Sequence, residues 1–148
     1  MVAKKKSGRT NTPVKRPKLL REKFSLNDSA FKWTFENCLW DSACWEDCKD
    51  LKSFAEKILS KLQNLESQKW QEILNSSGGK SEGHGNNNHF VMADKLPRDE
   101  KFAFIRLGYM EKYEKVFSLR LSAKERLIGF VDLNVFHVLW YDAAHRFF

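Results

Sequence analysis

The sequence predicts a single α+β domain behind a basic N-terminal arm, on three observations. One stretch near the start alternates strictly between apolar and polar residues, which is typical of a half-buried strand. An apolar stripe with helical spacing follows, and the last third of the chain alternates again over three short segments. Because 148 residues suit one domain, we expect these segments to form one unit with an N-terminal strand, an αα-hairpin, a third helix and a C-terminal three-stranded antiparallel meander.

The arm differs from the domain in its charge. Residues 1–23 hold nine Lys and Arg and one acid, a net charge of +8, whereas the remaining 125 residues hold 17 bases and 18 acids, a net charge of −1. A like-charged block with so few apolar residues is normally disordered and often contacts polyanions without reading their sequence. A solubilising leader without a binding role is the alternative. We therefore expect a domain at 24–148 and an arm that is dispensable for its folding.

A strand and a helical hairpin are the first predicted elements of the domain. The alternation from Phe31 to Glu36 predicts the strand, and the stripe from Leu51 to Leu65 predicts a helix that Asp50 can cap. Ser67 can cap a shorter second helix around Trp70. Because the link between them is short, these two helices predict an αα-hairpin.

A long loop and a third helix follow the hairpin. Residues Asn75–His89 are rich in Gly, Ser and Asn, and loops of this length inside compact domains are usually functional or disordered. A helix is expected from about Lys95 to Leu107, with Gly108 just past its end. On this helix we expect Phe102 and Ile105 to face the core.

The C-terminal third predicts a three-stranded antiparallel meander. Its strands are expected at Val116–Ser122, Arg126–Val131 and Val135–Tyr141, joined by tight connections. Alternate residues of a strand point to opposite faces of a sheet, so one face should be buried and the other polar. The expected buried residues are Phe117, Leu119, Leu121, Phe136, Val138 and Trp140, and the expected polar face of the first strand holds Ser118, Arg120 and Ser122.

Composition also bears on the compartment. No apolar run approaches the ~18 residues of a membrane span, and the basic start is not followed by the apolar segment of a secretory signal. We therefore expect a cytoplasmic protein without a membrane partner.

The cysteines Cys38, Cys44 and Cys48 are odd in number, and their spacing suits neither a disulfide framework nor a zinc knuckle. They are expected to be free.

The remaining candidate ligands form no metal motif. His84 and His89 lie four residues apart in the loop, His137 lies within an apolar strand, and no fixed spacing joins them to Asp142 and His145. The glycines of the loop also lack the pattern of a phosphate-binding P-loop. We expect neither a metal ion nor any other cofactor.

Basic residues cluster on the predicted meander and just after it. Arg120, Lys124 and Arg126 come from two neighbouring strands and the hairpin between them, and His145 and Arg146 follow the last strand. Guanidinium groups bind phosphate bidentately, and a histidine can move the proton of a ribose 2′-hydroxyl. The set predicts an RNA-cleaving site whose catalytic candidates are His145, Arg126 and Arg120, and in which Asp142 could orient the imidazole of His145. The alternative is a solvated sheet face with ordinary surface charges.

Further nucleic-acid-binding candidates lie around this cluster. The amides that end at Asn88 and His89 can bond a base edge or a ribose, although Asn also simply tolerates left-handed turn conformations. The candidates for nucleic-acid binding are Lys124, Arg146, Lys80, Asn88 and His89.

The stretch FSLRLSAKERLIGFVDLNVFHVLWYDAAHRFF resembles the C-terminal meander of the RelE/ParE toxin superfamily. In that meander an Arg-bearing strand, a short basic hairpin and an Arg-led second strand precede a third apolar strand and a His-Arg-rich ending. On this resemblance Arg120 and Arg126 match the strand arginines, and His145 and Arg146 match the ending. The upstream strand and αα-hairpin are similar to that fold as well. The chain after the arm also resembles a group of small uncharacterised bacterial proteins.

The resemblance implies a RelE-like toxin with an antitoxin as its partner protein. Such a protein would be a metal-independent endoribonuclease acting on mRNA at the ribosome, or a gyrase-directed toxin. This chain departs from the family in having Phe147 or Phe148 where a late Tyr is usual, in its third helix and long loop, and in its near-neutral domain. The alternative is a non-enzymatic protein- or nucleic-acid-binding module that uses the same sheet surface or the Trp-rich surface near Trp40 and Trp45.

Overall fold

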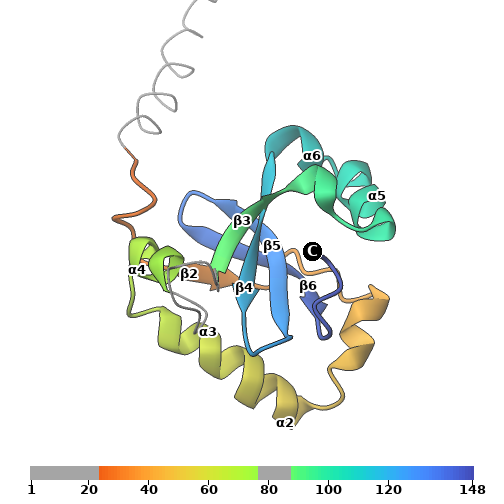
Figure 1. Cartoon of the computed structure of the whole chain (residues 1–148), viewed down its shortest axis with the longest axis horizontal. Coiled ribbons are helices and arrows are strands. Elements are labelled where there is room, and N and C mark those ends of the chain that lie inside the picture. Colours follow the sequence, from red (N-terminus) through yellow and green to blue (C-terminus); the bar gives the residue numbers. More distant parts are fainter. Residues whose placement is uncertain (1–23, 77–87) are drawn as a thin grey trace, which may run out of the picture.

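The computed structural model describes residues 24–76 and 88–148, which form one α+β unit around a five-stranded mixed sheet (Figure 1). Residues 1–23, the basic arm, and 77–87, the part of the predicted loop that holds Lys80 and His84, lie outside the described residues. The strands are β2 (Lys32–Thr34), β3 (Asn88–Met92), β4 (Lys115–Arg120), β5 (Arg126–Asp132) and β6 (Val135–Asp142). Their order across the sheet is β2-β6-β5-β4-β3.

The predicted meander is confirmed, but the sheet around it is larger than predicted. β4, β5 and β6 are antiparallel neighbours, while β2 adds a parallel edge strand beside β6 and β3 adds an antiparallel edge strand beside β4. The prediction placed Asn88 and His89 in a loop because Gly and Asn dominate the residues before them. The pairing of all five β3 residues with β4 outweighs that local preference. The sheet therefore has five strands and not three.

A bulge in β6 sets the register of the meander. Gly129 lies opposite Val138 but Ile128 lies opposite Trp140, so Leu139 is an additional residue of β6. A Cβ atom on residue 129 would collide with the carbonyl oxygen of His137, so only glycine fits there. The carbonyl of Leu139 instead accepts hydrogen bonds from the 38–45 segment, including those of the Leu39 N–H at 3.2 Å and the Trp45 indole N–H at 3.1 Å.

The predicted first helix is one continuous helix made of α2 (Leu51–Ser53), the π-helical segment η3 (Phe54–Leu59) and α3 (Ser60–Leu65). Asp50 caps it as predicted, since its Oδ1 accepts the N–H of Ser53 at 2.8 Å. A π turn contains one extra residue, so apolar positions on its two sides no longer share one face. Leu62 is therefore fully buried, whereas Leu51 is 80% exposed.

The second helix of the hairpin is α4 (Trp70–Asn75), which begins after Lys69 and not after the predicted cap, Ser67. The Glu72 carboxylate accepts the N–H of Lys69 at 2.9 Å, so the helix is capped by its own first turn. The fully buried Trp70 donates its indole N–H to the carbonyl of Asn134 at 2.9 Å, which ties the helix to the sheet.

The third predicted helix is shorter than expected. α5 spans Arg98–Arg106 and begins after Pro97, because a residue that precedes proline is disfavoured in helical conformation. Two 3-10 segments, η2 (Ala43–Asp47) and η5 (Ala93–Lys95), lie elsewhere in the chain, and α6 (Tyr109–Lys112) follows Gly108. The expectation that Phe102 and Ile105 face the core is wrong, since they are 65% and 52% exposed and α5 buries Phe104 instead.

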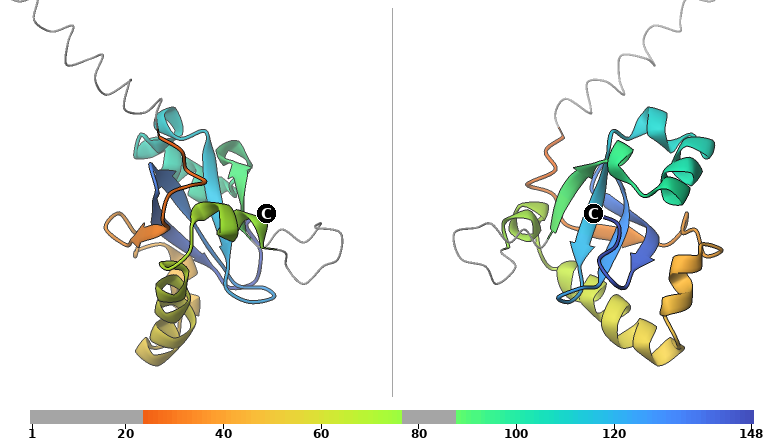
Figure 2. Two further views of the ribbon diagram at one scale, coloured as in Figure 1. Left: turned by 90° about the vertical axis from the view of Figure 1, so that its left-hand side faces the viewer. Right: turned by 45° about the vertical axis from the view of Figure 1, so that its right-hand side comes forward.

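Both faces of the sheet are covered. Trp70 of α4 packs on Phe117 at a ring distance of 5.0 Å on one face, and Phe104 of α5 packs on Trp140 at 6.3 Å on the other. α4 and α5 lie apart, with strands of the sheet between them (Figure 2). Ser118, predicted to be on a solvated face, is consequently buried, and Leu121 is only half-buried.

The other five predicted core residues are buried, although they do not all share one face. Val138 lies in one row with Gly129 and Phe117, whereas the bulge places Trp140 in the row of Ile128 and Ser118 on the opposite face. None of the helices in residues 24–76 and 88–148 is long and apolar enough to span a membrane.

Replacement of Trp140 tests this packing. Trp140 is 1% exposed, so Trp140→Ala should lower the free energy of unfolding by ~3–5 kcal/mol, as large-to-small changes of buried aromatic residues do. Trp40→Ala is the matched control, because that ring is 52% exposed and should cost clearly less. Urea denaturation measures both. A Trp140→Ala cost no larger than that of the control would contradict the assigned packing.

Candidate functional site

The structure places most of the predicted site residues at one end of the sheet. His89 lies at the start of β3, Arg120 at the end of β4, Arg126 at the start of β5 and Asp142 at the end of β6. The register pairs Arg120 with Arg126, and Arg126 with Asp142, in one row across three strands. Residues in such a row point to the same face of the sheet. We call them the Arg-Arg-Asp row.

Arg126 forms the centre of the row and is only 7% exposed. Its Nη1 donates to the carbonyl oxygens of Ser122 at 2.8 Å, Glu125 at 3.0 Å and Ala123 at 3.4 Å, which stabilises the hairpin that carries Lys124. Its buried Nε has no hydrogen-bond partner within the part of the chain that the structure describes. A buried N–H of a charged group is costly to leave without an acceptor.

Arg126 lies between a like charge and an opposite charge of the row. Burial lowers the pKa of Arg126, the neighbouring Arg120 lowers it further, and Asp142 raises it. A guanidinium nevertheless stays protonated in proteins, so both arginines of the row are cations of a kind that binds anions such as a phosphate group.

Asn88 supports the row from β3 and is 5% exposed. Its Nδ2 donates to the carbonyl of Ile73 at 3.0 Å and to Oγ of Ser76 at 3.1 Å, and its Oδ1 accepts the backbone N–H of Arg120 at 2.9 Å. The amide predicted to contact a nucleic acid thus joins the end of α4 to the end of β4. His89, half-buried, lies opposite Ser118, two residues before Arg120 of the row.

Residues 143–148 form a C-terminal tail that turns back along the sheet (Figure 1). The carboxylate of Asp142, 1% exposed, accepts the backbone N–H of Arg146 at 2.8 Å and that of Phe147 at 2.9 Å. The side chains of His145 and Arg146 are exposed, while Phe147 is buried against Trp140 at a ring distance of 5.9 Å. Both carboxylate oxygens of Asp142 therefore bond the main chain. A contact between Asp142 and the imidazole of His145 stays a hypothesis.

A second polar cluster, which the sequence did not indicate, holds the β4–β5 hairpin. The hydroxyl of Tyr141 donates to Glu125 at 2.6 Å, and Nζ of Lys57 lies 3.2 Å from the same oxygen. Burial alone would raise the pKa of Glu125, but hydrogen bonds from Tyr141, Ser122 and Lys57 outweigh it and lower that pKa. Burial and the bond to Glu125 raise the pKa of Tyr141. No local pattern could reveal this cluster, since its members come from three distant segments.

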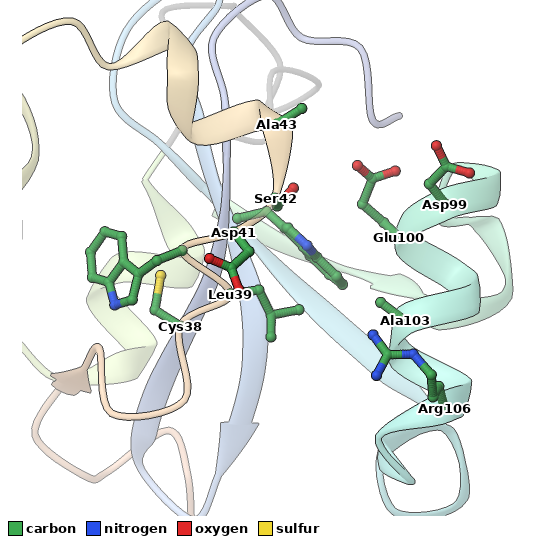
Figure 3. A pocket seen from close by; sticks show the side chains of 11 residues that line it. Cys38, Leu39, Asp41, Ser42, Ala43, Asp99, Glu100, Ala103 and Arg106 are labelled. Atoms are coloured by element: carbon green, nitrogen blue, oxygen red, sulfur yellow. The ribbon is translucent and has the colours of Figure 1, made fainter.

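A cavity of about 540 Å³ lies between the 38–43 segment and α5 (Figure 3). Carboxylates of Asp41, Asp99 and Glu100 line it together with Arg106, and Trp140 contributes to its wall. In residues 24–76 and 88–148 no group of three His, Cys, Asp or Glu is arranged to hold a metal ion. The cavity therefore offers acidic and apolar surface but no metal centre.

The three cysteines are free thiols, as predicted. Burial raises the pKa of Cys38 to about 12 and also raises that of Cys44 and Cys48. A thiol that stays protonated is a poor nucleophile. These residues therefore do not favour cysteine-based catalysis.

The chain matches no protein-family model, no curated protein and no solved structure. Its function must therefore be inferred from its own residues and their geometry.

The Glu125 cluster predicts a pH-dependent stability. A carboxyl whose pKa is lowered by folding contributes stability that is complete above its unfolded pKa, ~4.3, and is lost as the pH falls through the lower folded value. The wild-type protein should therefore lose more stability than Glu125→Gln below about pH 4. Thermal melting from pH 3 to 7 measures this, with Glu56→Gln, an exposed position on the same long helix as Lys57, as the control. Parallel acid limbs for wild type and Glu125→Gln would refute the role of the cluster.

Proposed function

We propose that this domain is a RelE/ParE-like toxin that acts on RNA as a metal-independent endoribonuclease. The observation that supports it best is the pairing of Arg120 and Arg126, directly opposite each other on neighbouring strands. The α+β fold and its antiparallel meander agree with the resemblance of this segment to the toxin superfamily.

The chemistry asked of this site is cleavage of a phosphodiester by the adjacent 2′-hydroxyl. The two guanidinium groups would hold the scissile phosphate and stabilise the negative charge that develops on it. A neutral histidine would take the proton of the hydroxyl, and a protonated one would supply a proton to the leaving oxygen. His145 is the candidate for both proton transfers, first as the base and then, once protonated, as the acid. It is exposed and follows Asp142 of the row by three residues.

RNA would approach through weaker, less specific contacts. Lys124 lies in the β4–β5 hairpin beside the row, and Arg146 follows His145 in the tail, so both can contact neighbouring phosphates. The domain itself is near neutral, so the long-range attraction for RNA or a ribosome would come from the arm, residues 1–23. Lys80 would add to it from outside the described residues.

The second candidate function is a non-enzymatic binding module that uses the same surface. The hydrogen bonds of Arg126 and Asn88 favour it, because they give both side chains a structural role that needs no chemistry. A protein partner at the Trp-rich surface would contact Trp40, which is 52% exposed, and scarcely Trp45, which is 8% exposed.

Expression in bacteria without an antitoxin separates the two functions. A toxin should arrest growth, and the purified protein should cleave RNA in the presence of EDTA. Arg120→Ala should lower cleavage ~10²–10³-fold through lost charge stabilisation, and His145→Ala ~10²–10⁴-fold through lost proton transfer. Lys115→Ala is the matched control, since it removes an exposed cation at the opposite end of β4. Normal growth with no cleavage by the wild-type protein would leave only the binding module.

A further inference from the structure

The tail is held by a single enclosed carboxylate. Asp142 is the last residue of β6, is 1% exposed, and bonds the main chain four and five residues further on, at Arg146 N and Phe147 N. Hydrogen bonds to an ionised group are shorter and roughly twice as strong as those between neutral groups. The two bonds close residues 143–146 into a turn.

The residue inside this turn has an unfavourable backbone conformation. His145 has a φ of 59°, in the left-handed region that residues other than glycine seldom adopt. Its side chain is exposed, so burial of the imidazole does not compensate for that strain. The hydrogen bonds to Asp142 and the packing of Phe147 on Trp140 can compensate for this backbone strain. The exposed His145 is thus held in place by its neighbours and not by its own contacts.

Asp142 also links the turn to the arginines. It lies directly opposite Arg126, which in turn lies opposite Arg120. Like charges directly opposite each other destabilise a sheet, and a carboxylate on the other side of Arg126 offsets that repulsion. One buried group therefore acts on the main chain of the tail and on the charge of the row.

We propose that Asp142 is a positioning residue, which fixes the main-chain turn that holds His145 and Arg146 directly after the end of β6, where Asp142 ends the Arg-Arg-Asp row. It acts on the backbone of the tail, and not on the imidazole. The turn follows from geometry alone, whereas its use in RNA cleavage rests on the proposed function.

Amide hydrogen exchange, measured by NMR on the full chain, tests the turn. In Asp142→Ala the amides of Arg146 and Phe147 should exchange at least tenfold faster than in wild type, since both lose their acceptor. Asp142→Asn keeps one acceptor oxygen and should release only one of the two amides. Asp132→Asn, an exposed aspartate at the other end of the sheet, should release neither.

Two further results complete this test. His145→Gly should keep both amides protected and melt above His145→Ala, because glycine adopts a positive φ without strain. Unchanged exchange at both amides in a folded Asp142→Ala or Asp142→Asn protein would overturn the proposal, as would a His145→Ala protein that melts at or above His145→Gly.

RNA cleavage provides the readout that a purely structural role would not change. Asp142→Ala should cleave saturating RNA at least tenfold more slowly than wild type, and Asp142→Asn should recover part of the rate. If wild type cleaves no RNA while the exchange results hold, the nuclease function fails and the turn stands. If wild type cleaves RNA and Asp142→Ala cleaves equally fast, the positioning role fails and the nuclease function stands.

Discussion

Phe117, Gly129 and Val138 share one row of the meander, and the row of Arg120 and Arg126 lies three residues closer to the end of the sheet, at the end of β4 and the start of β5. On β6 that row is reached only after four residues, because the bulge at Leu139 adds one. Without the bulge Tyr141 would lie opposite Arg126, and Trp140 would point away from α5. A Cβ at residue 129 would collide with the main chain of β6, so this position must be glycine. The charged row and the core on the face of Trp140 both depend on that glycine.

The covered sheet restricts what its polar residues can do. Asn88, Arg126 and Asp142 are each at most 7% exposed. Asn88 joins separate segments of the chain, whereas Arg126 bonds the main chain of its own hairpin and Asp142 that of the tail. The exposed groups near them come from a hairpin and a tail. A site of this kind would have a buried, charged floor and exposed outer contacts, which suits a polyanion held by its backbone. The same arrangement explains why the near-neutral domain would need a basic arm to attract such a ligand.

The candidate site was predictable in part. Arg120 and Arg126 could be placed on neighbouring strands from sequence, because a short hairpin joins two alternating segments. Their direct pairing could not, since the expected first strand ran to Ser122 whereas β4 ends at Arg120. Asp142 was singled out only as a possible partner of the His145 imidazole, since nothing in the local pattern shows that its oxygens bond the backbone of Arg146 and Phe147. The Lys57, Glu125 and Tyr141 cluster had no sequence signal, because long-range contacts leave no periodicity.

The sequence by itself determined the elements whose pattern is local: the alternating strands of the meander, the Asp50-capped helix, the end of α5 shortly before Gly108 and the contrast between arm and domain charge. Only the tertiary structure decided the pairing of β3, whose residues acquire a strand conformation through hydrogen bonds to β4. It also decided which face each residue occupies, since coverage by α4 and α5 buries both faces and the bulge inverts the alternation in β6. Local propensity acts over a few residues, whereas pairing and burial depend on partners that are distant in the chain.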